Sequence, residues 1–555
     1  MKIFTKNLLF FLLSGFLLFC FINNVSSQST RYFNEGTNNL WSNTANWDGG
    51  STLPSTNDHI VIQSGECLYS GTFTSGDFTI NADAGLIYPS SGVNLTIGGD
   101  LTVKGGSTTT ESGQIVEQVP ISITGNTNTE LFLQYFDSTG GGLTLYPYHL
   151  VSQPTTSALA DVFMNFWLYE WDEPNDQWNS LSQGNSLTLG KGYAAYYSGT
   201  SNQTVTFPGT HNKADVNGIT LHYTGTGSYP GVNLLGNPFP CALDFDDISL
   251  LTANSAQANM PSWTYYTLNA AGKNWAVWNI GGPGTNGAKQ YIAPMQGFYL
   301  VTQTGGGLFD IKKDARIIDF TANFLKESKL TTPYVSLTIK CDSNNYSDET
   351  ILHIHPQATS GVDFYYDALK MLNPFADVPN IYTTASSNED LAINAIEPIT
   401  NTKVIPIHFI AGLGGNYSIT ASNLTSFIPD FQDLYLEDTQ TNIMHNLNQN
   451  PMVSFSTAPG TFTNRFMLHL KSSTAGLNEL EENQISIYSY GKNVYIAGQE
   501  NSNAEIKIYS LIGQQVYNGT MNSGMNQITL EEPTGYYIVN LITATSSISE
   551  KVFIK

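Results

Sequence analysis

Alternating apolar and polar positions recur along most of the chain and predict short β-strands. In "AEIKIYSLIGQQVYNG" (504–519), for example, the alternation stops at a turn around Gly513 and then resumes. A period of two places every second side chain on one face of a strand, whereas a helix needs apolar residues at every third or fourth position. The segment "VDFYYDALKML" (362–372) is the best candidate for a helical or irregular insertion. The pattern therefore predicts a multidomain all-β protein.

Residues 28–115 contain the shortest of these segments. Leu95–Ile97 and Leu101–Val103, for example, are three-residue strands separated by glycine and polar turns. Strands this short bury little surface alone, so we expect them to stack coil on coil as a β-solenoid or to form a small β-sandwich. The phrases "WSNTANW" and "DHIVI" resemble modules that open many secreted bacterial surface proteins, often as part of a solenoid.

Residues 116–320 form the second predicted domain, which is rich in aromatic residues. Its segment "FMNFWLYEWDEPNDQWNSL" predicts a hairpin with one aromatic face. Trp167, Trp171 and Trp178 in this hairpin are candidates for stacking on the apolar faces of sugar rings. The alternative is that they anchor the core, and short strands favour it because they need large residues to fill the interior.

Residues 321–472 predict a further β-sandwich-like domain. The segments "YVSLTIKC" (334–341), "ILHIH" (351–355) and "TNRFMLHLK" (463–471) read as strands separated by polar turns. A polar and acidic stretch at 473–483 follows the last of them and is typical of a linker.

Residues 484–555 contain six or seven short strands at regular spacing, which predicts a small Ig-like β-sandwich. The hairpin "IKIYSLIGQQV", the strand "PTGYYIVNL" and the terminal "KVFIK" resemble the type A C-terminal sorting domain of the type IX secretion system of Bacteroidetes-type bacteria. Gly513, Gly535 and Lys551 are the signature positions of this resemblance.

The resemblance implies export to the outer cell surface or the medium by the type IX machinery. The domain is commonly cut off afterwards, and the body is then released or attached to surface polysaccharide. Residues 1–27 agree with export, because Lys2 and Lys6 precede an apolar run and small residues at 25–27 predict cleavage before Gln28. No later segment is apolar enough to predict a transmembrane helix.

The charge balance narrows the class of partner. The formal net charge is −23, and only 12% of the residues are charged. Such a balance opposes nucleic acids and anionic membranes as partners but is compatible with divalent cations. Cys67, Cys241 and Cys341 remain after the signal peptide. They allow at most one disulfide, whose pairing the sequence does not give, and buried free thiols are the favoured interpretation.

The sequence predicts no catalytic residue and no cofactor. It contains no His-Glu-x-x-His, Gly-x-Ser-x-Gly or phosphate-binding motif. His353 and His355 are two apart and could share a metal, and the acidic turns at 244–247 and 342–349 could hold a structural calcium ion. Ordinary turn chemistry also explains both turns. Asp172, Glu173 and Asp176 beside the tryptophans would suit a glycosidase, but the hairpin turn accounts for them too.

We therefore predict a secreted or cell-surface, non-catalytic protein with a role in adhesion, glycan binding or surface structure. Its partners would be the type IX secretion machinery and a surface polysaccharide or extracellular glycan. The alternative is an extracellular hydrolase acting on polysaccharide or protein. The sequence leaves open the ligand, the oligomeric state and the choice between release and surface attachment.

Overall fold

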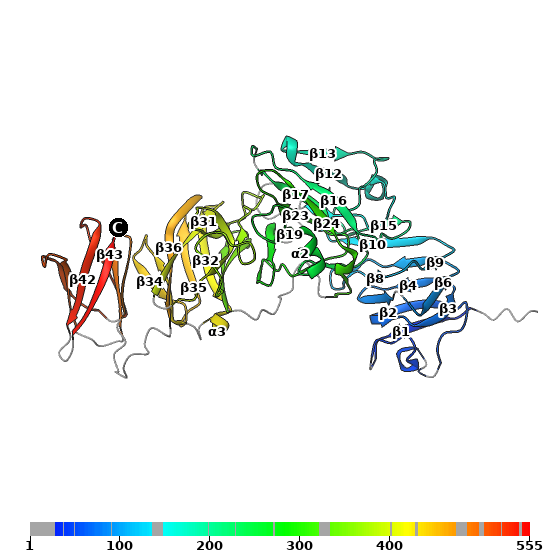
Figure 1. Ribbon diagram of the computed structural model, residues 1–555, viewed down its shortest axis with the longest axis horizontal. Helices are drawn as coiled ribbons and strands as arrows, with labels where there is room; N and C mark the ends of the chain where they lie inside the picture. The colour runs from blue at the N-terminus through cyan, green and yellow to red at the C-terminus, as the bar shows by residue number, and fades with distance from the viewer. Residues whose placement is uncertain are drawn as a thin grey trace, which may run out of the picture.

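The computed structural model describes residues 28–555 apart from 37, 49, 51, 90, 136–147, 198, 228, 270–271, 321–332, 400–401, 428–430, 473–485, 499–503, 523 and 543–546. It consists almost entirely of β-strands, which confirms the predicted fold class. Figure 1 shows the strands of the N-terminal part stacked at one end of the molecule, with β42 and β43 at the other end. The predicted signal peptide (1–27) and linker (473–483) lie outside the described residues. Within the described residues, no helix is long and apolar enough to cross a membrane.

The N-terminal part is a three-sided parallel β-solenoid, one of the two arrangements expected from its short strands. The first side holds β2 (His59–Leu68), β4 (Phe78–Ile80), β7 (Leu101–Val103) and β10 (Thr127–Leu133). The second side is formed by the end of β2 with β5 (Ala84–Tyr88) and β8 (Gln114–Glu117). The third holds β3 (Gly71–Ser75), β6 (Val93–Ile97) and β9 (Ser122–Ile123).

Equivalent positions of successive coils stack inside the solenoid. Ile60 lies beside Phe78 and Phe78 beside Leu101, and all three side chains are almost completely buried. The first coil is covered by β1 (Thr30–Asn34) and η1 (Thr44–Asn46), where Trp41 and Trp47 pack edge to face at 4.6 Å. The tryptophans of the opening motif therefore close the end of the core.

The middle of the chain forms two larger sheets and two small ones. The first large sheet has the strand order β11 (Tyr148–Val151), β14 (Tyr193–Tyr196), β12 (Trp167–Asp172) and β13 (Gln177–Leu181). The second large sheet has the order β17 (Val232–Gly236), β23 (Gly297–Val301), β19 (Thr264–Asn269), β20 (Asn274–Asn279) and β21 (Gly284–Thr285). The small sheets are β16 (Val216–Leu221) with β24 (Gly307–Ile311), and β22 (Tyr291–Ile292), β18 (Ala242–Asp244), β25 (Arg316–Ile317). The remaining elements are β15 (Gln203–Pro208), which pairs with β10, helix α2 (Ile248–Asn254), η2 (Ala160–Phe163), η3 (Glu173–Asn175) and η4 (Lys313–Ala315).

The third part is a β-sandwich made from one continuous ladder of strands. The ladder order is β34 (Ile443–Asn446), β33 (Phe431–Asp438), β36 (Gly460–Ser472), β31 (Thr402–Ala411), β29 (Asn380–Thr384), β30 (Asp390–Ile396), β27 (Ser347–Ile354), β26 (Tyr334–Cys341), β32 (Gly415–Ser422) and β35 (Met452–Thr457). Helix α3 (Leu424–Phe427) lies against β26. The segment 362–372 is irregular and contains the two-residue strand β28 (Ala368–Leu369), so the irregular alternative is the one observed.

The C-terminal part is a seven-stranded sandwich of two sheets, the Ig-like arrangement that the sequence predicted. One sheet contains β37 (Ser486–Tyr490), β38 (Asn493–Gly498) and β41 (Gly524–Thr529), and the other contains β40 (Gln515–Thr520), β39 (Glu505–Ser510), β42 (Gly535–Ile542) and β43 (Ser547–Ile554). Ile506 and Ile508 of β39 face the core between the sheets, together with Val539 and Val552.

The two parts on either side of residue 320 share a hydrophobic core. Leu268 and Trp275 of the middle part pack in one cluster with Ile351 and Ile393 of the sandwich. Polar contacts add to this, because the Trp275 indole donates to the Leu372 carbonyl at 2.9 Å. The domain boundaries expected from the sequence stay predictions, but these two parts depend on each other for burial. Cys67, Cys241 and Cys341 are buried free thiols in three separate places.

A deeply buried ion pair lies beside this shared core. The Lys370 ammonium contacts the Asp348 carboxylate, and the two side chains are 2% and 0% exposed. Asp348 also accepts hydrogen bonds from the Ile381 amide at 2.9 Å and from the Asn286 side chain at 3.0 Å. The pair therefore ties the middle part, through Asn286, to the sandwich.

We predict that Lys370→Met destabilises the protein by about 3–5 kcal/mol, because it leaves the Asp348 charge buried without its cation. Urea unfolding followed by tryptophan fluorescence measures the change. The matched control is Lys492→Met, which breaks an exposed pair with Glu531 and should cost less than about 1 kcal/mol. Equal effects of the two substitutions would contradict the conclusion that Asp348 depends on Lys370 as its buried partner.

Candidate functional site

One face of the sheet β11-β14-β12-β13 is covered by aromatic side chains. Tyr148 pairs with Tyr196, Tyr196 with Trp167, and Trp171 with Trp178. Directly opposed residues of antiparallel strands share a face, and so do alternate residues of one strand. The face, which we call the aromatic face, is therefore formed by Tyr148, Trp167, Tyr169, Trp171, Trp178 and Tyr196.

The rings of the aromatic face lie close together and are partly open to solvent. The ring centroids are 5.1 Å apart for Trp167 and Tyr196, 5.5 Å for Tyr148 and Tyr196, and 5.4 Å for Trp171 and Trp178. Trp167 is 52% exposed and Trp178 is 43% exposed, whereas Trp171 is half-buried. The structure thus brings the three tryptophans predicted for glycan stacking onto one face and leaves two of them exposed.

The opposite face of the same sheet fills a core. Leu168, Tyr193 and Ala195 alternate with the aromatic face and are buried in a cluster with Phe163 and Phe207. The sheet therefore has its core on one side, and burial on that side does not require Trp167 or Trp178. Trp263, Trp275 and Trp278, in contrast, are buried core residues.

A cavity of about 270 Å³ opens where the aromatic face meets the second large sheet and the segment 371–375. The Trp171 indole N–H donates to the Val232 carbonyl at 2.7 Å, which fixes the ring at the wall of the cavity. Burial raises the pKa of both Tyr148 and Tyr299, so their hydroxyls stay protonated at neutral pH. The aromatic walls of the cavity are Tyr148, Trp171, Trp178, Tyr229, Trp275, Tyr299 and Phe375.

The carboxylates of the hairpin turn do not converge on this cavity. Glu173 is buried, and its Oε1 accepts hydrogen bonds from the amides of Thr224 and Gly231 at 2.9 and 2.8 Å. Asp172 accepts from the side chains of Asn175 and Asn179, and the bond from Asn175 contributes most to lowering its pKa. Both residues hold local backbone in place, so their positions give no support to a glycosidase site.

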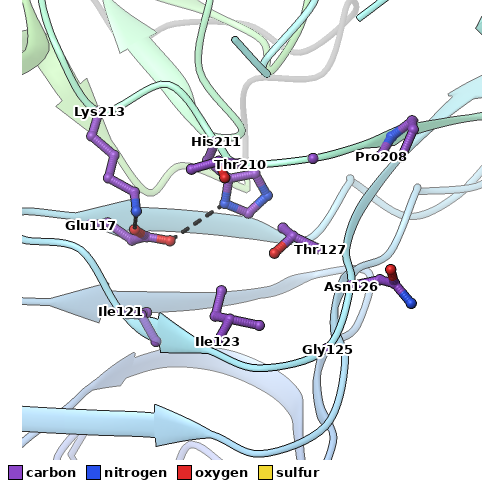
Figure 2. A pocket seen from close by; sticks show the side chains of 11 residues that line it. Glu117, Ile121, Ile123, Gly125, Asn126, Thr127, Pro208, Thr210, His211 and Lys213 are labelled. Carbon is purple, nitrogen blue, oxygen red and sulfur yellow. Dashed lines mark hydrogen bonds and ion pairs between the residues drawn. The ribbon is translucent and has the colours of Figure 1, made fainter. Parts of the chain in front are cut away.

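A second cavity, of about 310 Å³, contains a charged cluster between the solenoid and the segment 208–213. Figure 2 shows Lys213 and His211 pointing toward Glu117, with Asn126 and Thr127 on the opposite wall. Glu117 Oε2 lies 2.6 Å from Lys213 Nζ, and Oε1 lies 3.4 Å from His211 Nδ1. Burial alone would raise the pKa of Glu117, but His211 and Lys213 outweigh it and lower the pKa.

The polar atoms of this charged cluster contact one another and neighbouring protein groups. His211 Nε2 lies 2.7 Å from Thr129 Oγ1, so both ring nitrogens face protein groups. Glu117 likewise uses one oxygen for His211 and the other for Lys213. The Thr129 hydroxyl within reach of His211 is completely buried. We interpret the cluster as a tie between β8 and the segment that follows β15.

The histidines and acidic turns singled out from the sequence are also bound to protein groups. His353 Nε2 lies 2.8 Å from the Tyr366 carbonyl, while the His355 ring stacks on the Tyr366 ring at 3.8 Å. In the turn 244–247, Asp246 accepts from the Trp278 indole at 2.8 Å, and Asp247 caps helix α2. Over the part of the chain that the structure describes, no group of three or more His, Cys, Asp or Glu residues is placed to hold a metal.

The signature residues of the C-terminal sandwich occupy turn and edge positions. Gly513 has a φ of +85° at the turn between β39 and β40, a conformation that favours glycine. Gly535 begins β42, and Lys551 on β43 places its ammonium 4.0 Å from the ring centroid of Tyr536. These residues shape the surface of the sandwich.

Sequence reasoning missed residues of the aromatic face and of the second cavity. Alternation in "GYAAYY" could have placed Tyr196 beside the tryptophans. Glu117 and His211 are 94 positions apart, and no local pattern brings them together.

Two family models match the chain. The family described as "Domain of unknown function (DUF8693)" matches residues 32–470, and the "Secretion system C-terminal sorting domain" matches residues 479–555. No curated protein matches.

Three solved structures illustrate how limited the structural likeness is. An amphioxus IgVJ-C2 molecule is 10% identical, covers 41% of this chain and 92% of its own, and gives a TM-score of 0.10. The BSP domain of a biofilm associated protein is 7% identical over 77% of this chain and 96% of its own, with a TM-score of 0.15. A Ca²⁺-stabilised adhesin with which an Antarctic bacterium binds ice is 8% identical over 77% and 93%, with a TM-score of 0.10.

The sorting-domain match confirms the export prediction. The chain is delivered by the type IX secretion system to the cell surface or the extracellular space, and the secretion machinery is its partner during delivery.

The half-buried carboxyl of Asp246 predicts a pH dependence of stability. Burial raises its pKa from 3.8 to about 6. The native state therefore binds more protons than the unfolded state between these values, so the stabilisation is complete below pH 3.8 and is lost as the pH rises through about 6. We expect this carboxyl to contribute a fall in the free energy of unfolding between about pH 4 and pH 7, and Asp246→Asn to remove that contribution.

Urea unfolding at a series of pH values across this range provides the measurement. Asp48→Asn is the control, because hydrogen bonds from Arg31 and Tyr32 outweigh burial there and lower the pKa of Asp48. That substitution should leave the slope of stability against pH unchanged in the same range. An Asp246→Asn variant with the wild-type slope would show that this carboxyl does not titrate there.

Proposed function

Because the chain belongs over residues 32–470 to the family described as "Domain of unknown function (DUF8693)", its role has to be argued from its own residues, and we propose that the body contacts glycans without catalysing a reaction. The observation that carries the proposal is the pair of exposed indoles, Trp167 and Trp178, on the aromatic face. Delivery to the cell surface or the extracellular space puts this face where polysaccharides are found.

The chemistry of the aromatic face suits a sugar chain. The C–H faces of sugar rings are apolar and stack on aromatic rings, while tyrosine hydroxyls bond to sugar hydroxyls. Exposed aromatic residues that cluster on one face mark interaction sites more often than scattered ones do. The rings continue from the cavity at Trp171 to Trp167 at the far end of β12, so the face fits several sugar units in a row. The net charge of −23 favours neutral glycans over acidic ones.

A binding role also agrees with the state of the nearby ionisable groups. Glu173 holds the loop that begins at Thr224, and Glu117, His211 and Lys213 are bound to one another. A hydrolase would need two carboxylates or a nucleophile and base directed at one point of a cleft. No such arrangement is found among the described residues that line the two cavities.

We predict that the chain from residue 28 binds neutral polysaccharides and that Trp167→Ala and Trp178→Ala each weaken binding at least about tenfold. Glycan arrays followed by calorimetry on the best glycan measure the affinity. Tyr32→Ala is the matched control, because Tyr32 is 39% exposed and lies on the solenoid, away from the aromatic face. Circular dichroism confirms that each variant is folded.

Unchanged affinity in both tryptophan variants would place binding elsewhere on the body. Release of soluble sugars or peptides from polysaccharide or protein substrates would favour the hydrolase alternative instead.

Export provides a separate prediction that does not depend on the ligand. Deletion of residues 484–555 should leave the body in the periplasm, because the secretion machinery reads the C-terminal sandwich. Cell fractionation with surface protease accessibility measures the location of the truncated chain against the full chain. Surface delivery without the sandwich would contradict the prediction.

A further inference from the structure

Four side chains among the described residues join the body to the sorting domain. Glu437 on β33 and His469 on β36 belong to the body, while Tyr488 on β37 and Tyr495 on β38 belong to the sorting domain. His469 is paired with Tyr435, two residues before Glu437, so His469 and Glu437 share one face of the sheet. Tyr488 and Tyr495 are paired directly, and their rings stack at 5.2 Å.

These side chains are buried although they point away from the hydrophobic cores of their own units. The neighbouring Leu436 and Leu468 fill the core of the body, so Glu437 and His469 project from the opposite face. On the sorting domain, Val494 and Ile496 fill the core, and Tyr495 projects away from it. Side chains that point away from their own cores are normally exposed, yet these three are 0%, 2% and 1% exposed in the order Glu437, His469, Tyr495. The two units bury them against each other.

Hydrogen bonds join the four side chains across the contact. The Tyr495 hydroxyl donates a hydrogen bond to Glu437 Oε2 at 2.9 Å. His469 Nε2 lies 2.9 Å from the same oxygen, and His469 Nδ1 lies 2.8 Å from the Tyr488 hydroxyl. With a proton on His469 Nε2, each of these three hydrogen bonds has one donor and one acceptor. Burial, and next the charge of Glu437, raises the pKa of Tyr495, which keeps its hydroxyl a donor.

We propose that Glu437 and His469 form a socket on the body that seats the sorting domain in one orientation and keeps it bound after the connecting segment 473–485 is cut. The socket is selective because it requires two tyrosine hydroxyls at a fixed spacing. Loss of the sorting domain would also cost free energy. Glu437 Oε1 is buried without a hydrogen-bond partner among the described residues, so the carboxylate depends on the two hydrogen bonds that Oε2 accepts from His469 and Tyr495. Removal of the sorting domain would then be a second step after cleavage, with its own rate.

The experiment uses the chain from residue 28 to 555 with a protease recognition site in place of residues 476–481. After cleavage, size-exclusion chromatography and surface plasmon resonance measure how firmly the sorting domain is held. We expect it to co-elute with the wild-type body. In the double variant Tyr488→Phe, Tyr495→Phe the rings remain but both hydroxyls are lost, and we expect the dissociation constant to rise at least about tenfold.

Tyr490→Phe is the matched control, because Tyr490 lies on the same strand as Tyr488, is 36% exposed and takes no part in the cluster. It should retain wild-type affinity. Circular dichroism before cleavage verifies the fold of each chain. Separation of the wild-type sorting domain as readily as that of the double variant would overturn the proposal. So would equal affinities of the wild type and the double variant, because the hydroxyls would then play no part.

Discussion

Stacking between strands that are too short to bury themselves is the interaction on which the rest of the structure depends. In the solenoid, Ile60, Phe78 and Leu101 form one internal row, and each coil completes the core of the one before it. The same dependence recurs at larger scale, because Trp275 shares a buried cluster with residues of the next unit such as Ile351 and Ile393. A three-residue strand gains little by itself, so stability resides in the contacts between neighbours.

The aromatic face is a consequence of this architecture. The sheet β11-β14-β12-β13 uses one face for its core and has only part of its other face covered by the second large sheet. Trp171 lies where the cover ends, and Trp167 and Trp178 lie beyond it. The exposed rings therefore belong to a rigid sheet, which places them at fixed separations. A preorganised set of rings loses little conformational entropy when a ligand stacks on it.

The sequence predicts the local features well because they depend on period and turn chemistry. Alternation placed Trp167 and Trp171 on one face of their strand, and the short strands pointed to a stacked solenoid or a small sandwich. Alternation does not reveal what covers a face of a sheet. The sequence therefore allowed both a core role and a surface role for the tryptophans. The socket and the charged cluster had no local signal, since Glu437 and Tyr495 are 58 residues apart. Such contacts arise only when complete sheets dock.

Buried carboxylates mark the junctions between units of this acidic chain. Glu117 meets His211 and Lys213 at the end of the solenoid, Asp348 meets Lys370 beside the shared core, and Glu437 meets His469 under the sorting domain. A buried ion pair adds little net stability, because desolvation offsets most of the attraction between the charges. A misplaced junction, however, would leave a carboxylate buried and unpaired, which costs several kcal/mol. The chain has only 22 basic side chains against 45 acidic ones, so an incorrect docking would seldom bring a basic partner to a buried carboxylate. A cation or histidine at each junction therefore discriminates strongly between correct and incorrect docking. We conclude that apolar stacking supplies the stability of the units and that these polar contacts fix their register.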